Sequence, residues 1–185
     1  MNFRLVYEGP LRTGKTDRLK RLQELRRCFH LQLAELWQQP PLTGIRKYID
    51  KEYKPSNCCI LERVGPFEFA PLITKRLELI AGLKVLFLRP GAPGSLIGHG
   101  GDIDNRIKTL LDALRMPKGG ELIPNDVPRI NEQPFFCLLQ DDALITHLSI
   151  TTDRLLKETS QGYVMLVIDV HVVAAVPTMA NIGIA

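Results

Sequence analysis

The sequence lacks long hydrophobic runs and has few cysteines. No apolar stretch approaches the roughly 18 residues that a membrane-spanning helix needs, and the first residues lack the basic and apolar segments of a secretory leader. Its four cysteines (Cys28, Cys58, Cys59 and Cys137) have neither a zinc-site spacing nor that of a small disulfide framework. We therefore expect a cytoplasmic protein that is not exported and has no membrane partner.

Composition places the chain among ordinary globular proteins. Of 185 residues, 45% are hydrophobic and 24% are charged, which argues against a largely disordered chain. Because no shift in composition divides it, residues 1–185 are expected to form a single domain. The net charge of +4 is concentrated in residues 12–27, where seven basic residues stand against two acidic ones. Such a basic face is typical of a protein that binds a polyanion, and equally of a solvated helix.

Hydrophobic periodicity predicts the elements of the fold. Strands are expected at 3–8, 58–64, 83–88, 144–152 and 163–173, and helices at 15–37 and 104–115. The last strand is almost continuously apolar and should be central in its sheet. Residues 42–57 are expected to be loop with at most a short helical turn, and residues 118–140 an irregular insertion. These elements predict an α+β fold (mixed α/β) with one mixed sheet covered by two principal helices.

The segment 102–114 joins acidic side chains, a lysine and an apolar helix face. Ile107, Leu110, Leu111 and Leu114 share the face that should be buried, so Asp104 and Lys108 lie along its border one turn apart. Both can address one ligand at the helix start, where the free N–H groups favour a phosphate. Asp102 and Asp104 are solvated, act as caps, or are neutralised by a cation.

Simpler interpretations of these residues remain open. An aspartate at a helix start is the usual N-cap, and Asp104 with Lys108 can form a surface pair worth about 0.3–0.5 kcal/mol. The pair Asp141-Asp142, considered alone, is typical of a turn before a strand. Phe29 and Trp37 are expected in the core.

Together, the acidic residues and the lysine resemble the signature of a known family. Residues 102–105 (Asp-Ile-Asp-Asn), Lys108, residues 112–114 (Asp-Ala-Leu) and residues 141–143 (Asp-Asp-Ala) are similar to the RusA family of Holliday junction resolvases. The resemblance implies that Asp102, Asp104 and Asp142 bind Mg²⁺, with Mn²⁺ as a possible substitute, and that these three and Lys108 are catalytic. Asn105, Asp112 and Asp141 are expected to support them.

The same resemblance implies a partner and an activity. We expect a homodimeric endodeoxyribonuclease with a RusA-like fold that cleaves four-way or other branched DNA during recombination or repair, encoded by a phage or prophage. Under this interpretation Arg12, Lys15, Arg18, Arg106 and Lys108 contact the DNA backbone. The insertion at 118–140 and the long basic helix depart from the family pattern, which bears on junction specificity more than on the chemistry.

Two other functions compete with this interpretation. Residues 9–16 (Gly-Pro-Leu-Arg-Thr-Gly-Lys-Thr) satisfy the P-loop pattern of nucleotide-binding proteins, between a predicted strand and a predicted helix. The helix after a P-loop packs on its sheet from the first turn, whereas Asp17, Arg18, Lys20 and Arg21 crowd this helix start, so nucleotide binding ranks second. A non-catalytic DNA-binding module that uses the acids structurally is a further alternative.

Overall fold

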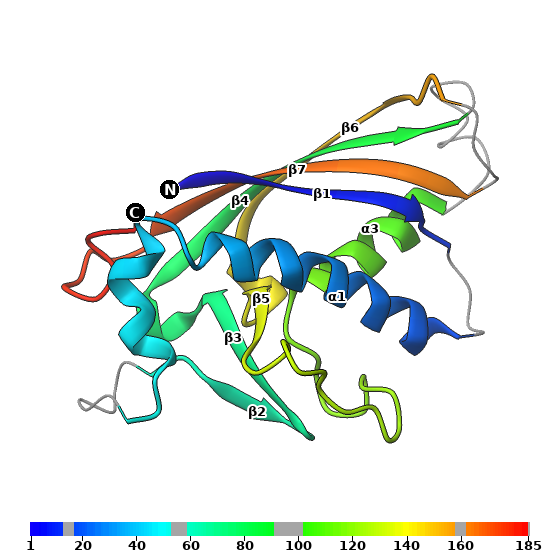
Figure 1. Cartoon of the computed structure of the whole chain (residues 1–185). Helices are drawn as coiled ribbons and strands as arrows, with labels where there is room; N and C mark the ends of the chain where they lie inside the picture. Colours follow the sequence, from blue (N-terminus) through cyan, green and yellow to red (C-terminus); the bar gives the residue numbers. More distant parts are fainter. Residues whose placement is uncertain (13–16, 53–58, 91–101, 158–161, 185) are drawn as a thin grey trace.

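The computed structural model describes residues 1–12, 17–52, 59–90, 102–157 and 162–184, and leaves out the side chain of Asp102. In chain order the elements, with η for a 3-10 helix, are β1 (Asn2–Pro10), α1 (Arg18–Leu36), η1 (Leu42–Ile49), β2 (Glu62–Val64), β3 (Phe67–Ile73), η3 (Lys75–Leu77), β4 (Leu79–Arg89), α3 (Asp102–Leu114), β5 (Phe135–Leu139), η4 (Asp142–Leu144), β6 (Ile145–Arg154) and β7 (Tyr163–Ala174). The combination of helices with two sheets that contain both parallel and antiparallel pairs confirms the α+β class (Figure 1).

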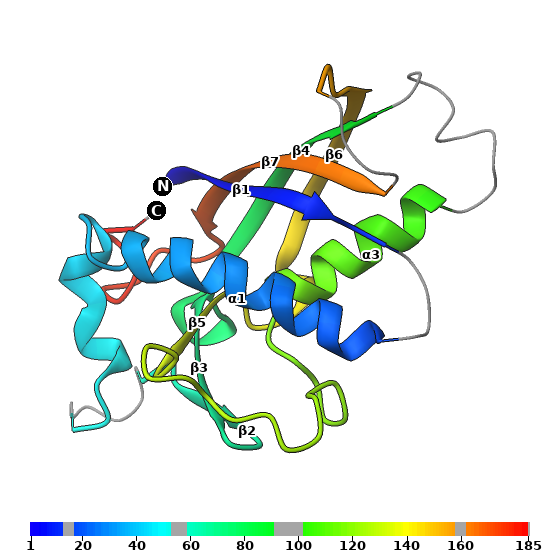
Figure 2. The ribbon, with the colours of Figure 1, turned by 45° about the vertical axis from the view of Figure 1, so that its right-hand side comes forward.

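The larger sheet has the strand order β1-β7-β4-β6. Strand β7 is antiparallel to β1 and β4, and β4 is parallel to β6. Alternate residues of β7, from Val164 to Val172, are buried on the face that α1 and α3 cover (Figures 1 and 2). The central position predicted for residues 163–173 is therefore confirmed, and the strands expected at 3–8, 83–88 and 144–152 are present with shifted ends.

A second sheet, in the order β2-β3-β5, was not expected from the sequence. The prediction of a single sheet is therefore wrong for the described residues. Strand β3 is missing from the prediction because its residues 67–73 are buried on both sides and contain Pro71, so neither alternation nor β-propensity marks them. Strand β5 pairs parallel to β3 and lies inside the segment expected to be irregular. The strand expected at 58–64 is reduced to Glu62–Val64, and residues 53–58 lie outside the described part.

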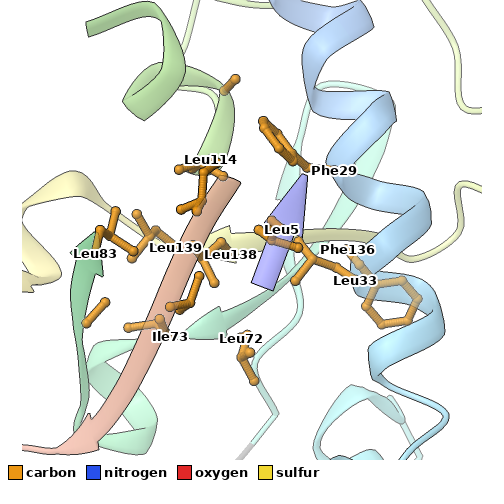
Figure 3. Close-up of a cluster of buried hydrophobic side chains, with 14 of the residues drawn as sticks. Leu5, Phe29, Leu33, Leu72, Ile73, Leu83, Leu114, Phe136, Leu138 and Leu139 are labelled. Carbon is orange, nitrogen blue, oxygen red and sulfur yellow. The ribbon is translucent and has the colours of Figure 1, made fainter. Parts of the chain in front are cut away.

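Helix α1 confirms the predicted amphipathic helix. Leu22, Leu25, Phe29 and Leu33 recur at helical spacing and are buried against β1, β5 and α3. Trp37 and Phe29 are core residues, as predicted. Figure 3 shows this core, in which Phe29 and Leu33 of α1 and Leu114 of α3 lie around the side chains of both sheets.

The two edges of the larger sheet differ. On β1, the Val6 N–H donates to Gln32 Oε1 at 2.9 Å, and Gln32 Nε2 donates to the Val6 carbonyl at 2.8 Å. The side-chain amide of Gln32 thus occupies the position of a neighbouring strand and blocks the β1 edge. Strand β6 is the opposite edge of the sheet, and its burial pattern leaves most of its residues exposed. Further strand pairing is therefore easier at β6 than at β1.

His30 fixes the position of β5 on α1. The Phe136 N–H donates to His30 Nδ1 at 2.8 Å, so the neutral ring carries its proton on Nε2 and donates it to the Asn131 carbonyl at 2.9 Å. The ring also stacks on Phe136, with 5.8 Å between centroids. Protonation of Nδ1 would break the bond from Phe136.

We expect the protein to lose stability as the pH falls through the ordinary imidazole range. Burial lowers the pKa of His30, against smaller opposing effects of its hydrogen bonds and Glu132. The unfolded chain then binds a proton more readily than the native one, so this contribution to stability is complete above the unfolded pKa of about 6.5 and is lost below it. Urea unfolding at about pH 7.5 and about pH 5.5 measures the effect, and in His30→Gln the difference between the two pH values should shrink. An unchanged difference in the variant would contradict the assignment.

Candidate metal and nucleic-acid site

Helix α3 presents the first group of predicted site residues. Ile107, Leu110 and Leu114 are buried as predicted, and they hold the helix against the core. Asp104 and Lys108 are exposed and lie one turn apart at the border of this buried face. Asn105 is also exposed, and its carbonyl accepts a hydrogen bond from Thr109 Oγ1 at 2.8 Å. The surface position predicted for the Asp104 and Lys108 pair is confirmed, whereas the side chain of Asp102 lies outside the described residues.

The acidic pair lies where strand β6 begins. Asp141 caps η4, because its Oδ1 accepts the Ala143 N–H at 2.9 Å, and its Oδ2 lies 3.4 Å from Lys118 Nζ. The bond from Ala143 lowers the pKa of Asp141 more than burial raises it, and Asp142 and Lys118 lower it further. The Asp142 side chain is 45% exposed, and its Oδ2 lies 3.9 Å from Arg115 Nε. Asp141 thus acts as a local cap, and Asp142 faces the end of α3.

The structure does not bring Asp142 next to Asp104. The Met116 N–H bonds to the Leu139 carbonyl at 2.9 Å, so the chain before the acidic pair runs beside the carboxyl end of α3. Asp104 lies in the first turn, and the helical rise of about 1.5 Å per residue separates it from Asp112 by roughly 12 Å. Figure 2 shows this first turn at the end of α3 that points away from β5. Among the described residues no group of three or more His, Cys, Asp or Glu side chains is arranged to hold a metal ion.

A buried ion network occupies the space between α1 and α3 instead. Asp112 Oδ1 accepts from Arg115 Nη2 at 2.6 Å, and its Oδ2 accepts from Arg18 Nη2 at 2.8 Å. Arg115 also donates to both carboxylate oxygens of Glu121, at 2.9 and 3.0 Å. Burial raises the pKa of Glu121, but the bonds from Arg115 and the Lys118 N–H outweigh it and lower the pKa overall. Asp112, predicted as a supporting site residue, is thus part of the packing between the two helices.

Arg26 does not belong to the basic face that was expected of residues 12–27. Its side chain is 1% exposed and donates to the Asp112 carbonyl at 3.1 Å and to the Glu121 carbonyl at 3.2 Å. Burial is the largest influence on this group and lowers the pKa of Arg26 to about 10. Arg26 lies between Leu22 and Phe29 on the buried stripe of α1. Its helical spacing therefore indicated a buried position, although its charge suggested an exposed one.

The predicted insertion at 118–140 is attached to α1. Arg27 donates to Asp126 at 3.1 Å and to Glu132 at 2.8 Å, and Glu132 also accepts the Arg129 N–H at 3.0 Å. Burial raises the pKa of Glu132, but Arg27 and Arg129 lower it by more. The ion pairs hold this segment along α1, so it forms one wall of a surface rather than a free loop.

That surface is a groove along the first half of α1. A cavity of about 580 Å³ is lined on the side of α1 by Asp17, Arg18, Lys20, Glu24 and Arg27, and on the side of the attached segment by Ile123 and Arg129. Arg129 is 70% exposed. Its part in a basic surface could not be predicted, because the fold of residues 118–134 brings it to α1.

Of the described residues that are predicted to contact DNA, Arg12 follows β1, Arg18 begins α1, and Arg106 and Lys108 belong to α3. Arg12 and Lys108 are exposed, whereas Lys15 lies outside the described residues. Arg18 lines the groove but is also bound to Asp112. Arg106 is half-buried and engaged in an interaction of its own. Contact with DNA by these five residues stays a prediction.

The P-loop interpretation gains no support from the strand that precedes it. Gly9 and Pro10 still belong to β1, where they pair with Val164 and Tyr163. Strand β1 is an edge strand antiparallel to β7, whereas a P-loop follows a strand of a parallel sheet flanked by helices. Residues 13–16, which include the lysine of the pattern, lie outside the described part.

Comparison with models of protein families, with curated proteins and with solved structures gives no match. The resemblance to the RusA family therefore depends on the motif residues of the sequence. None of the helices in the described ranges combines the length and the apolar character needed to cross a membrane.

Proposed function

We propose that the protein is a divalent-metal-dependent endodeoxyribonuclease that acts on four-way or otherwise branched DNA in the cytoplasm. The observation that carries the proposal is the placement of the motif on the fold. The Asp-x-Asp-Asn segment begins helix α3, Lys108 follows Asp104 by one turn on the exposed side, and Asp141-Asp142 leads directly into β6. The order of these motifs along the chain is the one by which the sequence resembles the RusA family.

Asp102, Asp104 and Asp142 would hold Mg²⁺, and Lys108 would contact the phosphate. Carboxylate oxygens are the ligands that Mg²⁺ takes, and the ion supplies activation of water and neutralisation of charge on the phosphate. The described arrangement does not assemble this set, because Asp142 lies by the carboxyl end of α3. Its side chain is nearly half exposed and lies 3.9 Å from Arg115 Nε, but rotation of this side chain alone cannot carry the carboxylate along α3 to Asp104.

DNA would lie along the basic groove of α1 and the exposed side of α3. Arg18 and Arg27 are already paired with acidic residues, so the exposed Lys20 and Arg129 are the basic side chains of the groove that would meet the DNA. Contacts of this kind go to the phosphate backbone and are weakened by salt. The exposed basic side chains of this groove, together with the exposed Lys108 of α3, support a nucleic-acid substrate.

A homodimer would suit this substrate. A four-way junction has approximate two-fold symmetry, so a two-fold dimer presents two copies of the site for paired cuts. Within the larger sheet, Gln32 blocks the β1 edge, and the β6 edge is the more exposed one. We propose that the dimer forms by pairing at β6. In this arrangement Asp142 of one protomer would be offered to the metal site of the partner.

The test of the proposed function is cleavage of a labelled four-way junction. We expect symmetric nicks in Mg²⁺ or Mn²⁺, no nicks in a chelator, and little cleavage of a linear duplex with the same sequence. Absence of any metal-dependent cleavage, at protein concentrations where the junction is fully bound, would refute the nuclease.

A non-catalytic DNA-binding module is the second candidate. It is favoured by the structural engagement of the acids, since Asp141 is a cap and Asp112 is bound by Arg18 and Arg115. The same junction experiment distinguishes it, because the module binds the junction in Mg²⁺ and leaves every strand intact.

A further inference from the structure

A second polar site lies on the face of the larger sheet that is turned away from α1 and α3. It is a cavity of about 940 Å³ lined by Arg4, Lys84, His147, Asp169, His171 and Gly82, among others. All six belong to strands β1, β4, β6 and β7 of this sheet. Their neighbours along the strands, such as Leu83 and Val170, are buried on the other face. The cavity therefore lies apart from the proposed nuclease site.

The register of the strands brings these side chains into two adjacent rows. His171 of β7, Gly82 of β4 and His147 of β6 are direct cross-strand partners. In the next row, Arg4, Asp169 and Lys84 are partners in the same way. Residues two apart on a strand share a face, so both rows line one depression.

Gly82 forms the floor of this depression. A side chain there would begin 3.7 Å from the Cβ of His147 and 3.8 Å from the Cβ of His171. With two strand spacings of about 4.8 Å each, the two histidine backbones stand roughly 10 Å apart. The missing side chain leaves a gap between two imidazole rings that is wide enough for a small tetrahedral anion.

The charges around the gap favour an anion. Lys84 is exposed, and Arg4 is paired with Asp169, the acidic residue among the described residues that line the cavity. His171 Nδ1 is bonded to Asn2 Oδ1, which orients the ring. A protonated imidazole donates through both nitrogens, so His171 can donate to Asn2 and to an anion together. Arg4 and Lys84 together exceed Asp169 by one positive charge.

We propose that this depression binds a phosphate group, between His147 and His171 and beside Lys84. Phosphate offers acceptor oxygens in a tetrahedron, which fits donors that converge from three strands, and charge-assisted bonds to it are strong. The group can come from a small phosphomonoester or from the backbone of a nucleic acid. The proposal is independent of the nuclease, because none of its residues belongs to α3 or to the acidic pair.

The test follows the histidine ring signals by NMR during a titration with inorganic phosphate at constant ionic strength. We expect the signals of His147 and His171 to shift to saturation, and those of buried His30 to stay constant. Gly82→Leu should abolish the shifts, whereas Gly44→Leu, where no atom lies within 4 Å of an added Cβ, should leave them. Lys84→Gln should raise the half-saturating phosphate concentration roughly tenfold, and exposed Lys75→Gln should leave it unchanged.

Two further arms identify the source of the phosphate. Saturation by a nucleoside monophosphate alone assigns a small phosphomonoester, whereas saturation by a short DNA duplex assigns the nucleic-acid backbone. Equal shifts with chloride at the same ionic strength, or saturation by Zn²⁺ and not by phosphate, would overturn the proposal. Asp104→Asn should bind phosphate normally, so failure of this site and failure of the nuclease are separate results.

Discussion

Replacing Asp104 with asparagine is expected to lower metal-dependent junction cleavage by roughly a hundredfold or more. Asparagine keeps the size of the side chain but removes the negative charge, and a hard divalent cation is bound mainly by that charge. The measurement is the initial rate of nicking of a labelled four-way junction in Mg²⁺. Binding of the junction should persist, because Asp104 is separate from the basic groove of α1.

Folding provides the control for this variant. Asp104 is exposed, so Asp104→Asn should unfold at the same temperature as the wild type within experimental error. Glu35→Gln removes an exposed charge from the last turn of α1, and this variant should cleave the junction at the wild-type rate. Equal loss of cleavage in both variants would trace the effect to general electrostatics, and wild-type cleavage by Asp104→Asn would remove Asp104 from the site.

Removing the Asp112 carboxylate is expected to destabilise the protein by about 3–5 kcal/mol. Asp112→Ala leaves Arg115, whose side chain is 5% exposed, without the carboxylate that lies closest to it, and it frees Arg18 from α3. The cost arises because a buried guanidinium loses a compensating charge while water cannot reach it. Urea unfolding of the variant and the wild type measures the difference in the free energy of unfolding.

Asp104→Ala is the matched control, because it removes the same side chain from the exposed border of the same helix. It should change the free energy of unfolding by no more than about 0.5 kcal/mol. A similarly small effect of Asp112→Ala would mean that the network between α1 and α3 contributes nothing to stability. Glu121 and Asp142 would then suffice as the carboxylate partners of Arg115.

Periodicity predicted the elements whose two faces differ. Helices α1 and α3 and strand β7 were predicted because their apolar residues recur with the period of the element. Strands β3 and β5 escaped prediction because both sides are buried and neither run alternates. Arg26 was misplaced for a related reason, since a charged residue on a buried stripe is read as surface unless its partners, Asp112 and Glu121, are known to lie opposite.

The candidate site was predictable in part. The exposed Asp104 and Lys108 pair follows from helix geometry, because a local spacing determines which side chains share a border. The position of Asp142 does not, because residues 115–141 separate it from α3 and their path depends on contacts such as Arg27 with Asp126 and Glu132. Pairing of Asp142 with Arg115 is a tertiary contact that no spacing in the chain encodes.

Binding of Mn²⁺ to the junction-bound protein tests most directly whether the carboxylates of Asp104 and Asp142 share one divalent cation. The bound ion can be counted by its electron paramagnetic resonance signal, with the junction held uncleaved by phosphorothioate linkages. The proposed function predicts that Asp104→Asn and Asp142→Asn each lose this ion, while Glu35→Gln retains it. If Asp142→Asn binds Mn²⁺ with wild-type affinity and cleaves the junction at the wild-type rate, Asp142 has no part in the metal site and the account is contradicted.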